Sequence, residues 1–211
     1  MRKGAIMSEL LSIAASLFMV AVVITYFLQV QNNLSTPNPA TWLIWSVVTT
    51  MNSISYFFVV NGNWFKFSLS VVVAIGLSTI FLYTLRTGRF GKIGWVEILS
   101  FLMAVAIGLV WKTSGNNSLA NLSLQVVLAI SFIPTIKGLL SRELKERPLP
   151  WLLAVSGYSL QVLAILTDWN SDWVALAYPI VNGIFGNGSV AVIIFYQAKQ
   201  QASKPQPRRI K

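Results

Sequence analysis

No charged residue occurs between Glu9 and Lys66, and this gap restricts the possible folds of the chain more than any other feature. A helix needs about 20 apolar residues to cross the hydrocarbon core of a membrane, so the gap holds two such helices and a connection. The 211-residue chain is 10% charged, whereas soluble domains carry about 25% charged residues. We therefore expect an all-α integral membrane protein.

Uncharged apolar runs predict seven transmembrane helices, separated by short segments rich in Gly, Pro, Asn and Ser that are typical of loops. We interpret the start of the chain as the first helix and not as a cleaved signal peptide, because its apolar run is too long. The predicted spans are residues 10–30, 40–60, 65–85, 93–111, 118–137, 150–167 and 173–197.

Basic residues are unevenly divided between the two sides that these spans define. Of the 16 Lys and Arg residues, twelve fall on the side of the C-terminus and four on the side of the N-terminus. Short loops rich in Lys and Arg stay in the cytoplasm. We expect a multi-pass protein of the cell membrane with its N-terminus outside and its C-terminus cytoplasmic. Anionic lipid then accounts for the basic charge, and we expect no nucleic-acid partner.

The chain contains no cysteine and no histidine. Disulfides, thiol catalysis and the commonest ligands of zinc and haem are therefore excluded. The predicted spans also hold no pair of acidic residues for acid–base chemistry. We expect no enzyme activity, no cofactor and no metal site.

One short pattern occurs twice. Trp42 in "PATWL" and Trp151 in "PLPWL" are 151 − 42 = 109 residues apart, and "NGNW" (61–64) matches "NSDW" (170–173) at the same spacing. An even number of helices separates the copies, so both run in the same direction. The pattern predicts a 3+1+3 parallel repeat. Its parts are a first three-helix unit (1–88), a linker helix (89–114), a second three-helix unit (115–198) and a basic cytoplasmic tail (199–211).

The last predicted helix contains "YPIVNGIFGNGSVAVIIFY", with Pro179, Asn182, Gly183 and Tyr196. Pro134 in the fifth helix is followed by Thr, where a Pro-Gln pair is typical of one transporter superfamily. With the 3+1+3 order and the outer N-terminus, these residues resemble the SWEET and semiSWEET sugar transporters and the wider PQ-loop superfamily. The resemblance covers residues 10–197, mainly through topology. It implies facilitative passage of a small neutral polar solute, such as a sugar, by alternating access between the repeats.

Polar side chains at mid-depth are the candidate substrate ligands, because they are costly in hydrocarbon unless they face a partner or a cavity. Asn52 and Gln161 occupy the same position in the two repeats, and Asn182 matches the asparagine of the resembling family's sugar site, with Val73 at its repeat position. Trp45 and Tyr158 offer flat faces to a sugar. For each amide the alternative role is a hydrogen bond that joins two helices.

Two prolines and one acidic residue complete the candidates. Pro134 and Pro179 interrupt backbone hydrogen bonding within predicted helices and are candidate hinges. Glu97 lies in a predicted span, where a carboxylate suggests proton coupling, although its helix is the linker and lies apart from the expected pathway.

Two other functions remain open from the sequence. A vitamin-precursor transporter of the nicotinamide riboside type has a related seven-helix fold, and the eight Trp residues suit a flat ring. The chain is also compatible with a non-transporting subunit or receptor of a larger membrane complex, or with a homo-oligomer.

Overall fold

The computed structural model describes residues 3–86, 94–169 and 173–202, and these residues form helices and connections without any strand. Seven segments are long and apolar enough to cross a membrane, which confirms the predicted number of spans and a multi-pass membrane architecture. Asn170 of the second "NSDW" pattern and residues 203–211 of the predicted tail lie outside the described residues.

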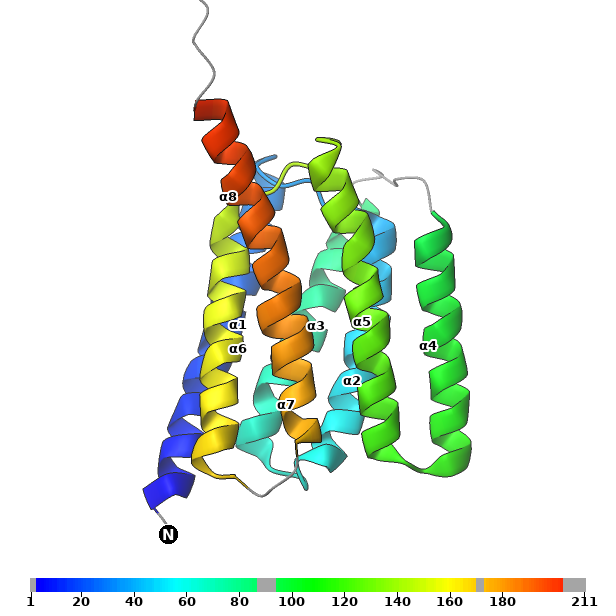
Figure 1. Ribbon diagram of the computed structural model, residues 1–211, viewed down its shortest axis with the longest axis vertical. Helices are drawn as coiled ribbons and strands as arrows, with labels where there is room; N and C mark the ends of the chain where they lie inside the picture. The colour runs from blue at the N-terminus through cyan, green and yellow to red at the C-terminus, as the bar shows by residue number, and fades with distance from the viewer. Residues whose placement is uncertain (1–2, 87–93, 170–172, 203–211) are drawn as a thin grey trace, which may run out of the picture.

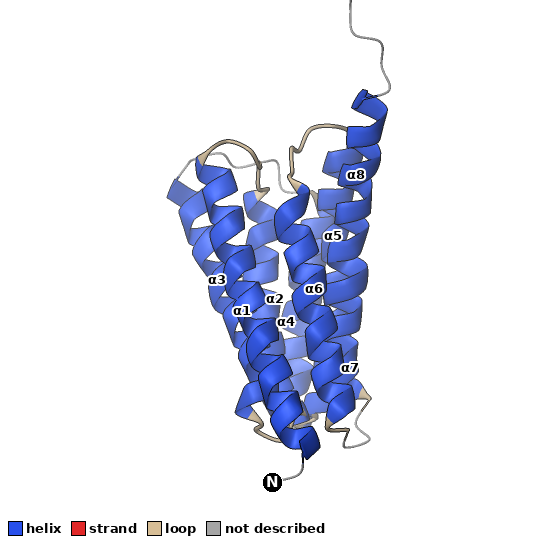
Figure 2. Cartoon of the chain, turned by 90° about the vertical axis from the view of Figure 1, so that its left-hand side faces the viewer, coloured by secondary structure: helices blue, strands red, loops and turns tan. Residues whose placement is uncertain are grey.

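The helices run side by side along one axis, with their connections at both ends (Figure 2). Their bounds are α1 (Lys3–Gln31), α2 (Pro39–Val59), α3 (Trp64–Arg86), α4 (Trp95–Ser114), α5 (Asn117–Leu140), α6 (Pro148–Thr167), α7 (Val174–Tyr178), the π-helix η1 (Pro179–Asn187) and α8 (Gly188–Ala202). We call the end where α1 begins the N-terminal end of the bundle and the end where α8 finishes the C-terminal end (Figure 1).

The last predicted span, 173–197, is not one α-helix but the series α7, η1 and α8. Pro179 begins the π-helical part, because proline has no N–H to continue the α-helical ladder. Single π-helical turns within α-helices occur frequently at functional sites. This irregular segment faces the interior of the bundle through Asn182 and Gly183, which are both buried.

Helices α2 and α6 begin in the same way. Each has a proline in its first turn, Pro39 or Pro148, where the missing N–H costs nothing. Asn38 caps α2 by accepting a hydrogen bond from the N–H of Ala40 at 3.1 Å. Arg147 precedes α6 in an extended conformation without a side-chain cap. The two prolines of the repeated pattern therefore mark helix starts, as expected of that residue.

The connections that lead into α2 and α6 share one backbone pattern. Asn33 and Arg142 both adopt a positive φ, 54° and 61°, which ends α1 and α5. The next N–H groups bond back to the carbonyls of Gln29 and Gly138 respectively. The two connections also contact each other, because Thr36 N donates to Lys145 O at 2.8 Å and Lys145 N donates to Thr36 Oγ1 at 2.8 Å. Thr36 and Lys145 are 109 residues apart.

The helices pack in a regular set of pairs. Helix α3 packs against both α1 and α2, and the α7–η1–α8 segment packs against both α5 and α6. Helix α1 lies against α6, and α2 lies against α5. Helix α4 packs on α5 and α2 at the edge of the bundle (Figure 1). Its outer face exposes Leu102 and Leu109, as expected for a helix that borders lipid.

Candidate functional site

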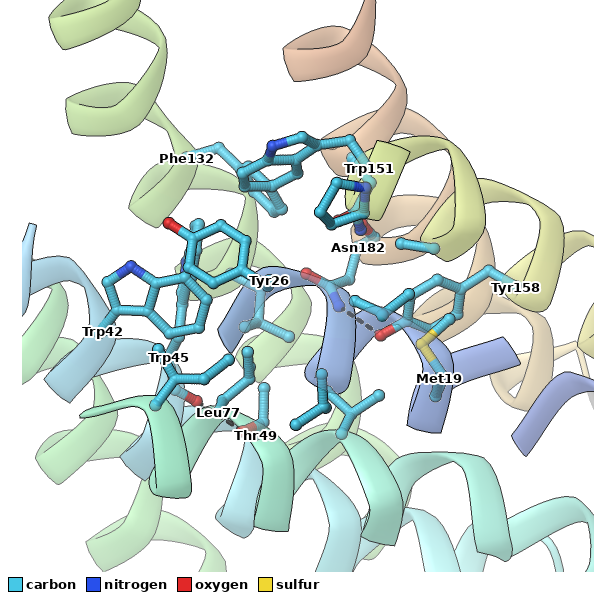
Figure 3. Close-up of a pocket in the computed structure, with 18 residues that line it drawn as sticks. Met19, Tyr26, Trp42, Trp45, Thr49, Leu77, Phe132, Trp151, Tyr158 and Asn182 are labelled. Atoms are coloured by element: carbon cyan, nitrogen blue, oxygen red, sulfur yellow. Dashed lines mark hydrogen bonds between the residues drawn. The ribbon is translucent and has the colours of Figure 1, made fainter. Parts of the chain in front are cut away.

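A central cavity lies toward the C-terminal end of the bundle, between α1, α2, α3, α5, α6 and η1 (Figure 3). Among the described helices, only α4, α7 and α8 contribute no residue to its wall. The cavity volume is about 70 Å³, which holds a few waters but is well below the roughly 300–1,000 Å³ of ligand pockets. This conformation is therefore closed to a sugar-sized molecule.

The polar part of the wall is a chain of hydrogen bonds around Asn182. Asn182 Nδ2 donates to Tyr158 Oη at 3.0 Å, and Tyr158 Oη lies 2.9 Å from Tyr178 Oη. Figure 3 shows the Asn182 amide pointing into the cavity, with its nitrogen toward Tyr158. Asn187 donates to the backbone oxygen of Asn182 at 2.8 Å. Among the described residues, none donates a hydrogen bond to Asn182 Oδ1, so this oxygen can accept a bond from a molecule in the cavity.

Two glycines allow η1 to approach the cavity wall closely. A Cβ at Gly183 would overlap the Tyr158 ring, and a Cβ at Gly186 would overlap the Phe132 ring. Both positions therefore need glycine for steric reasons and not for an unusual φ. The close approach brings Asn182 and Tyr158 within hydrogen-bonding distance.

Aromatic rings form part of the wall toward the C-terminal end, and aliphatic side chains of α1, α3 and α5 form much of the remainder. The ring centroids of Tyr26 and Trp42 lie 4.7 Å apart, those of Trp42 and Trp45 lie 5.3 Å apart, and those of Trp45 and Trp151 lie 6.3 Å apart. Trp45 Nε1 donates to Ser131 Oγ at 2.6 Å, so its polar atom is satisfied. We call Tyr26, Trp42, Trp45 and Trp151 the aromatic wall. Its faces offer apolar contact to a flat ring.

Glu146 lies behind the aromatic wall and is buried, although it precedes α6 and lies outside the helices. Its carboxylate accepts hydrogen bonds from Tyr26 Oη at 2.8 Å and from Trp151 Nε1 at 3.4 Å. Burial raises the pKa of Glu146 from its ordinary 4.5 to about 7, and hydrogen bonds from Tyr26 and Trp151 limit the rise. This carboxyl can therefore change protonation state near neutral pH.

The structure brings three of the five predicted ligands together. Trp45, Tyr158 and Asn182 all line the central cavity, and so does Val73, which lies one repeat before Asn182. Asn52 and Gln161 do not line it. They lie further toward the N-terminal end, about one helical turn beyond the cavity-lining residues of their helices.

Asn52 and Gln161 instead make hydrogen bonds between helices. Asn52 Oδ1 accepts from Asn121 Nδ2 at 3.0 Å and from Gln125 Nε2 at 2.7 Å, which joins α2 to α5. Gln161 Nε2 donates to the backbone oxygen of Lys66 at 3.1 Å, which joins α6 to α3. We call Asn52, Asn121 and Gln125 the amide cluster. Of the two roles open from the sequence, these contacts favour helix association for both residues.

The two candidate hinges have different settings. Pro179 lies at the start of η1 and is buried. Pro134 lies inside α5, which continues to Leu140, and borders a second cavity of about 710 Å³ at the C-terminal end. This second cavity opens between the start of α4, the end of α5 and the connection from α1 to α2. Hinge motion at either proline remains a prediction.

Glu97 caps its own helix. Its Oε2 accepts a hydrogen bond from the N–H of Gly94 at 3.0 Å, in the first turn of α4. A carboxylate at a helix N-terminus stabilises the helix dipole and its free N–H groups. Glu97 therefore caps α4 at the edge of the bundle, away from the central cavity, and borders the second cavity.

An ion pair closes the N-terminal end of the space between α3 and α6. Lys66 Nζ lies 3.0 Å from Asp168 Oδ2 and donates to the Asp168 backbone oxygen at 2.9 Å. Lys66 is buried, whereas Asp168 is 44% exposed. The central cavity therefore has the ion pair on one side and Glu146 on the other.

Sequence reasoning missed four residues around the cavity: Tyr26, Trp42, Glu146 and Trp151. The two tryptophans of the repeated pattern served only to mark the repeat in the sequence, yet both are 5% exposed and line the cavity. Their recurrence 109 residues apart is a signal that pointed to them. Glu146 carries no such signal, because it resembles its charged neighbours in "RELKERP".

Comparison of the chain with protein-family models, curated proteins and solved structures found no match. Within the described residues, no group of three acidic, histidine or cysteine side chains is arranged to hold a metal ion. The cavity offers amide and hydroxyl groups, aromatic faces and a nearby carboxyl. Groups of these kinds are able to form hydrogen bonds and apolar contacts with a polar molecule.

Proposed function

We propose that this chain is a membrane transporter that passes a small neutral polar solute, such as a sugar, between two parallel three-helix units. The observation that carries the proposal is the central cavity, which lies between α1–α3 and α5–η1 and presents the amide of Asn182. The interface between two repeats is the usual place of a transporter's substrate site.

The packing pairs support the repeat on which this proposal depends. With α1–α3 taken as one unit and α5–α8 as the other, the pair α1 and α6 corresponds to the pair α5 and α2. The positive-φ residues Asn33 and Arg142 and the helix-starting Pro39 and Pro148 are each 109 residues apart. Thr36 and Lys145, at that same spacing, bond to each other, as residues near a pseudo-twofold axis do. In this scheme α4 is the linker.

Alternating access requires that the two ends of the pathway open in turn. The Lys66–Asp168 pair joins the units at the N-terminal end, which we assign to the outside from the distribution of basic residues. Tyr26 and Glu146 join them at the C-terminal end, which we assign to the cytoplasm. A cavity of about 70 Å³ with both ends joined corresponds to a closed state between the two open ones.

The aromatic wall favours a second candidate function, transport of a nucleoside-like or riboside-like vitamin precursor. Four aromatic residues lie together at the cavity: Tyr26, Trp42, Trp45 and Trp151. Base–aromatic stacking is worth about 1–3 kcal/mol per base, so such a wall suits a flat ring attached to a ribose.

Uptake into proteoliposomes tests both candidates. Purified protein is assayed with a panel of labelled sugars, nucleosides and ribosides, with protein-free vesicles as the baseline. We expect one class to enter faster than the baseline, and Asn182→Ala to slow that uptake about ten-fold through loss of one buried hydrogen bond. The matched control is Phe185→Leu, because Phe185 lies in the same π-helix but is 70% exposed.

Uptake at the baseline rate for every solute would overturn the transport proposal. Stable co-purification with a large membrane complex would then favour the non-transporting subunit. Equal slowing by Asn182→Ala and Phe185→Leu would show that η1, and not the Asn182 amide, is the sensitive feature.

A further inference from the structure

Glu146 is a buried carboxylate in a segment whose other charged side chains face outward. The chain is extended before α6, so successive side chains point in opposite directions. Lys145 and Arg147 are exposed, whereas Glu146 between them is 9% exposed. Inward placement of a carboxylate costs free energy unless a partner or a proton compensates for it.

Within the part of the chain that the structure describes, the Glu146 carboxylate has no cationic partner. Among the described residues, no Lys or Arg nitrogen lies within 4 Å of its oxygens. The adjacent Lys145 turns away, because its Nζ donates to the backbone oxygen of Asn33 at 3.3 Å. From the elements packed around it, Tyr26 of α1 is the titratable contact, while Trp151 of α6 and Ser35 of the connection are uncharged.

The two donors to Glu146 also form part of the cavity wall. Tyr26 belongs to α1 and Trp151 to α6, and both line the central cavity. Glu146 therefore joins the two proposed units at one end of the cavity. If α1 and α6 move apart there, both hydrogen bonds break and water reaches the carboxyl.

We propose that Glu146 is a proton-binding site that controls opening of the cavity at the C-terminal end. This inference rests on the proposed transport function. In the closed form the carboxyl is buried between Tyr26 and Trp151, and it binds a proton. When this end opens, the hydrated carboxyl releases the proton to water. Opening is therefore coupled to loss of one proton.

The direction of the pH effect follows from the difference between the two forms. The closed form has its Glu146 pKa raised to about 7 by burial, while an exposed carboxyl returns to its ordinary 4.5. Protons therefore stabilise the closed form fully below pH 4.5, and this stabilisation is lost as the pH rises through 7. Proton linkage between a pKa of about 7 in the closed form and 4.5 in the open form predicts about ten-fold more open form at pH 8 than at pH 6.

The absence of cysteine from the chain allows a clean test. Ala154→Cys introduces a thiol into the cavity wall on α6, one turn after Trp151. The protein is reconstituted into vesicles, and a membrane-impermeant thiol reagent is added on the side of the C-terminus. Ser141→Cys, at an exposed position of the same end, corrects for the pH dependence of the reagent. We expect the corrected labelling rate to rise about ten-fold between pH 6 and pH 8.

Two variants separate a proton site from a structural one. In the Glu146→Gln background, which cannot ionise, the Ala154→Cys labelling rate should be slow and independent of pH. In the Tyr26→Phe background the carboxylate loses a donor that stabilises its charge, so the midpoint should move to higher pH. Persistence of the ten-fold rise in Glu146→Gln, or an unmoved midpoint in Tyr26→Phe, would overturn the proposal.

The labelling readout does not depend on any transported solute. Labelling that depends on pH, without solute uptake, would support the proton site and overturn the transport function. Uptake with labelling that is independent of pH would support transport and overturn the proton site.

Discussion

The two halves of the bundle use buried amides differently. Toward the N-terminal end, the amide cluster is packed between α2 and α5, and Asn52 Oδ1 accepts two hydrogen bonds from other side chains. Toward the C-terminal end, Asn182 borders a cavity, and none of the described residues donates a hydrogen bond to its side-chain oxygen. One half joins helices through its amides, and the other presents an amide to a cavity.

The difference shows that burial of a polar residue in a membrane helix does not by itself identify a substrate site. Asn52 and Asn182 are almost equally buried, at 0% and 6% exposure. Their roles differ because neighbouring helices supply amide partners to Asn52, whereas η1 carries Asn182 to a wall of aromatic rings. The useful distinction between Asn52 and Asn182 is whether a side-chain atom without a hydrogen-bond partner faces a cavity.

We expect the largest loss of stability from a substitution that disturbs the close packing of η1 against Tyr158, in the half of the bundle that contains the cavity. Gly183→Ala places a Cβ within the Tyr158 ring, so the ring or the helix has to shift. We expect a loss of about 1–3 kcal/mol in unfolding free energy, measured by denaturation in detergent or bicelles. Gly188→Ala is the control, because its Cβ would meet Val155 at an ordinary 3.9 Å. Similar losses for both variants would contradict this account of the cavity wall.

Replacement of Asn52, the shared acceptor of the amide cluster, tests the half of the bundle toward the N-terminal end. Asn52→Leu leaves Asn121 and Gln125 without their shared partner between α2 and α5. Hydrogen bonds between membrane helices contribute about 0.6 kcal/mol each, up to roughly 1.7, so we expect a loss of about 1–2 kcal/mol. Uptake per folded molecule should not change.

The control for Asn52→Leu is Thr50→Val, because Thr50 is exposed on the same helix and bonds to Ser46 of its own helix. Thr50→Val should change the unfolding free energy little. If Asn52→Leu abolished uptake without loss of stability, the amide cluster would belong to the transport pathway and the comparison between the halves would fail.

The number and order of the helices could be predicted from the sequence, because apolar length and charge position determine them directly. The predicted α2 span of 40–60 differs little from the observed Pro39–Val59. The first span was placed at residue 10, yet α1 begins at Lys3, because polar residues can continue a helix beyond the apolar run. Pro179 was identified from the sequence as an interruption of the last helix, but residue type alone does not show that a π-helix follows it.

The candidate site was predicted only in part. Asn182, Tyr158 and Trp45 were identified from residue type and depth, and all three line the cavity. The same reasoning also selected Asn52 and Gln161, which bond to neighbouring helices and do not line the cavity. Depth along a helix does not reveal which face of the helix meets a partner. Glu146 depends on the direction of one side chain in an extended segment, which residue type does not determine.

Tyr158 offers a milder test of the cavity half. Tyr158→Phe keeps the ring against Gly183 but removes the hydroxyl that lies between Asn182 and Tyr178. We expect a loss of about 0.5–1.5 kcal/mol in unfolding free energy and slower uptake, because Asn182 is no longer oriented. Slower uptake that matches the loss of folded protein alone would assign Tyr158 to packing, like the amide cluster.

The ion pair at the N-terminal end should give the smallest effect. Asp168 is 44% exposed, and exposed ion pairs contribute about 0–1 kcal/mol. In Asp168→Asn, Lys66 Nζ keeps its bond to the backbone oxygen of residue 168 at 2.9 Å, so we expect a loss below about 0.5 kcal/mol. Lys66→Met removes both bonds and should cost more in the same denaturation assay. An equal cost for the two variants would mean that the Asp168 carboxylate, and not the backbone contact, holds this end of the bundle closed.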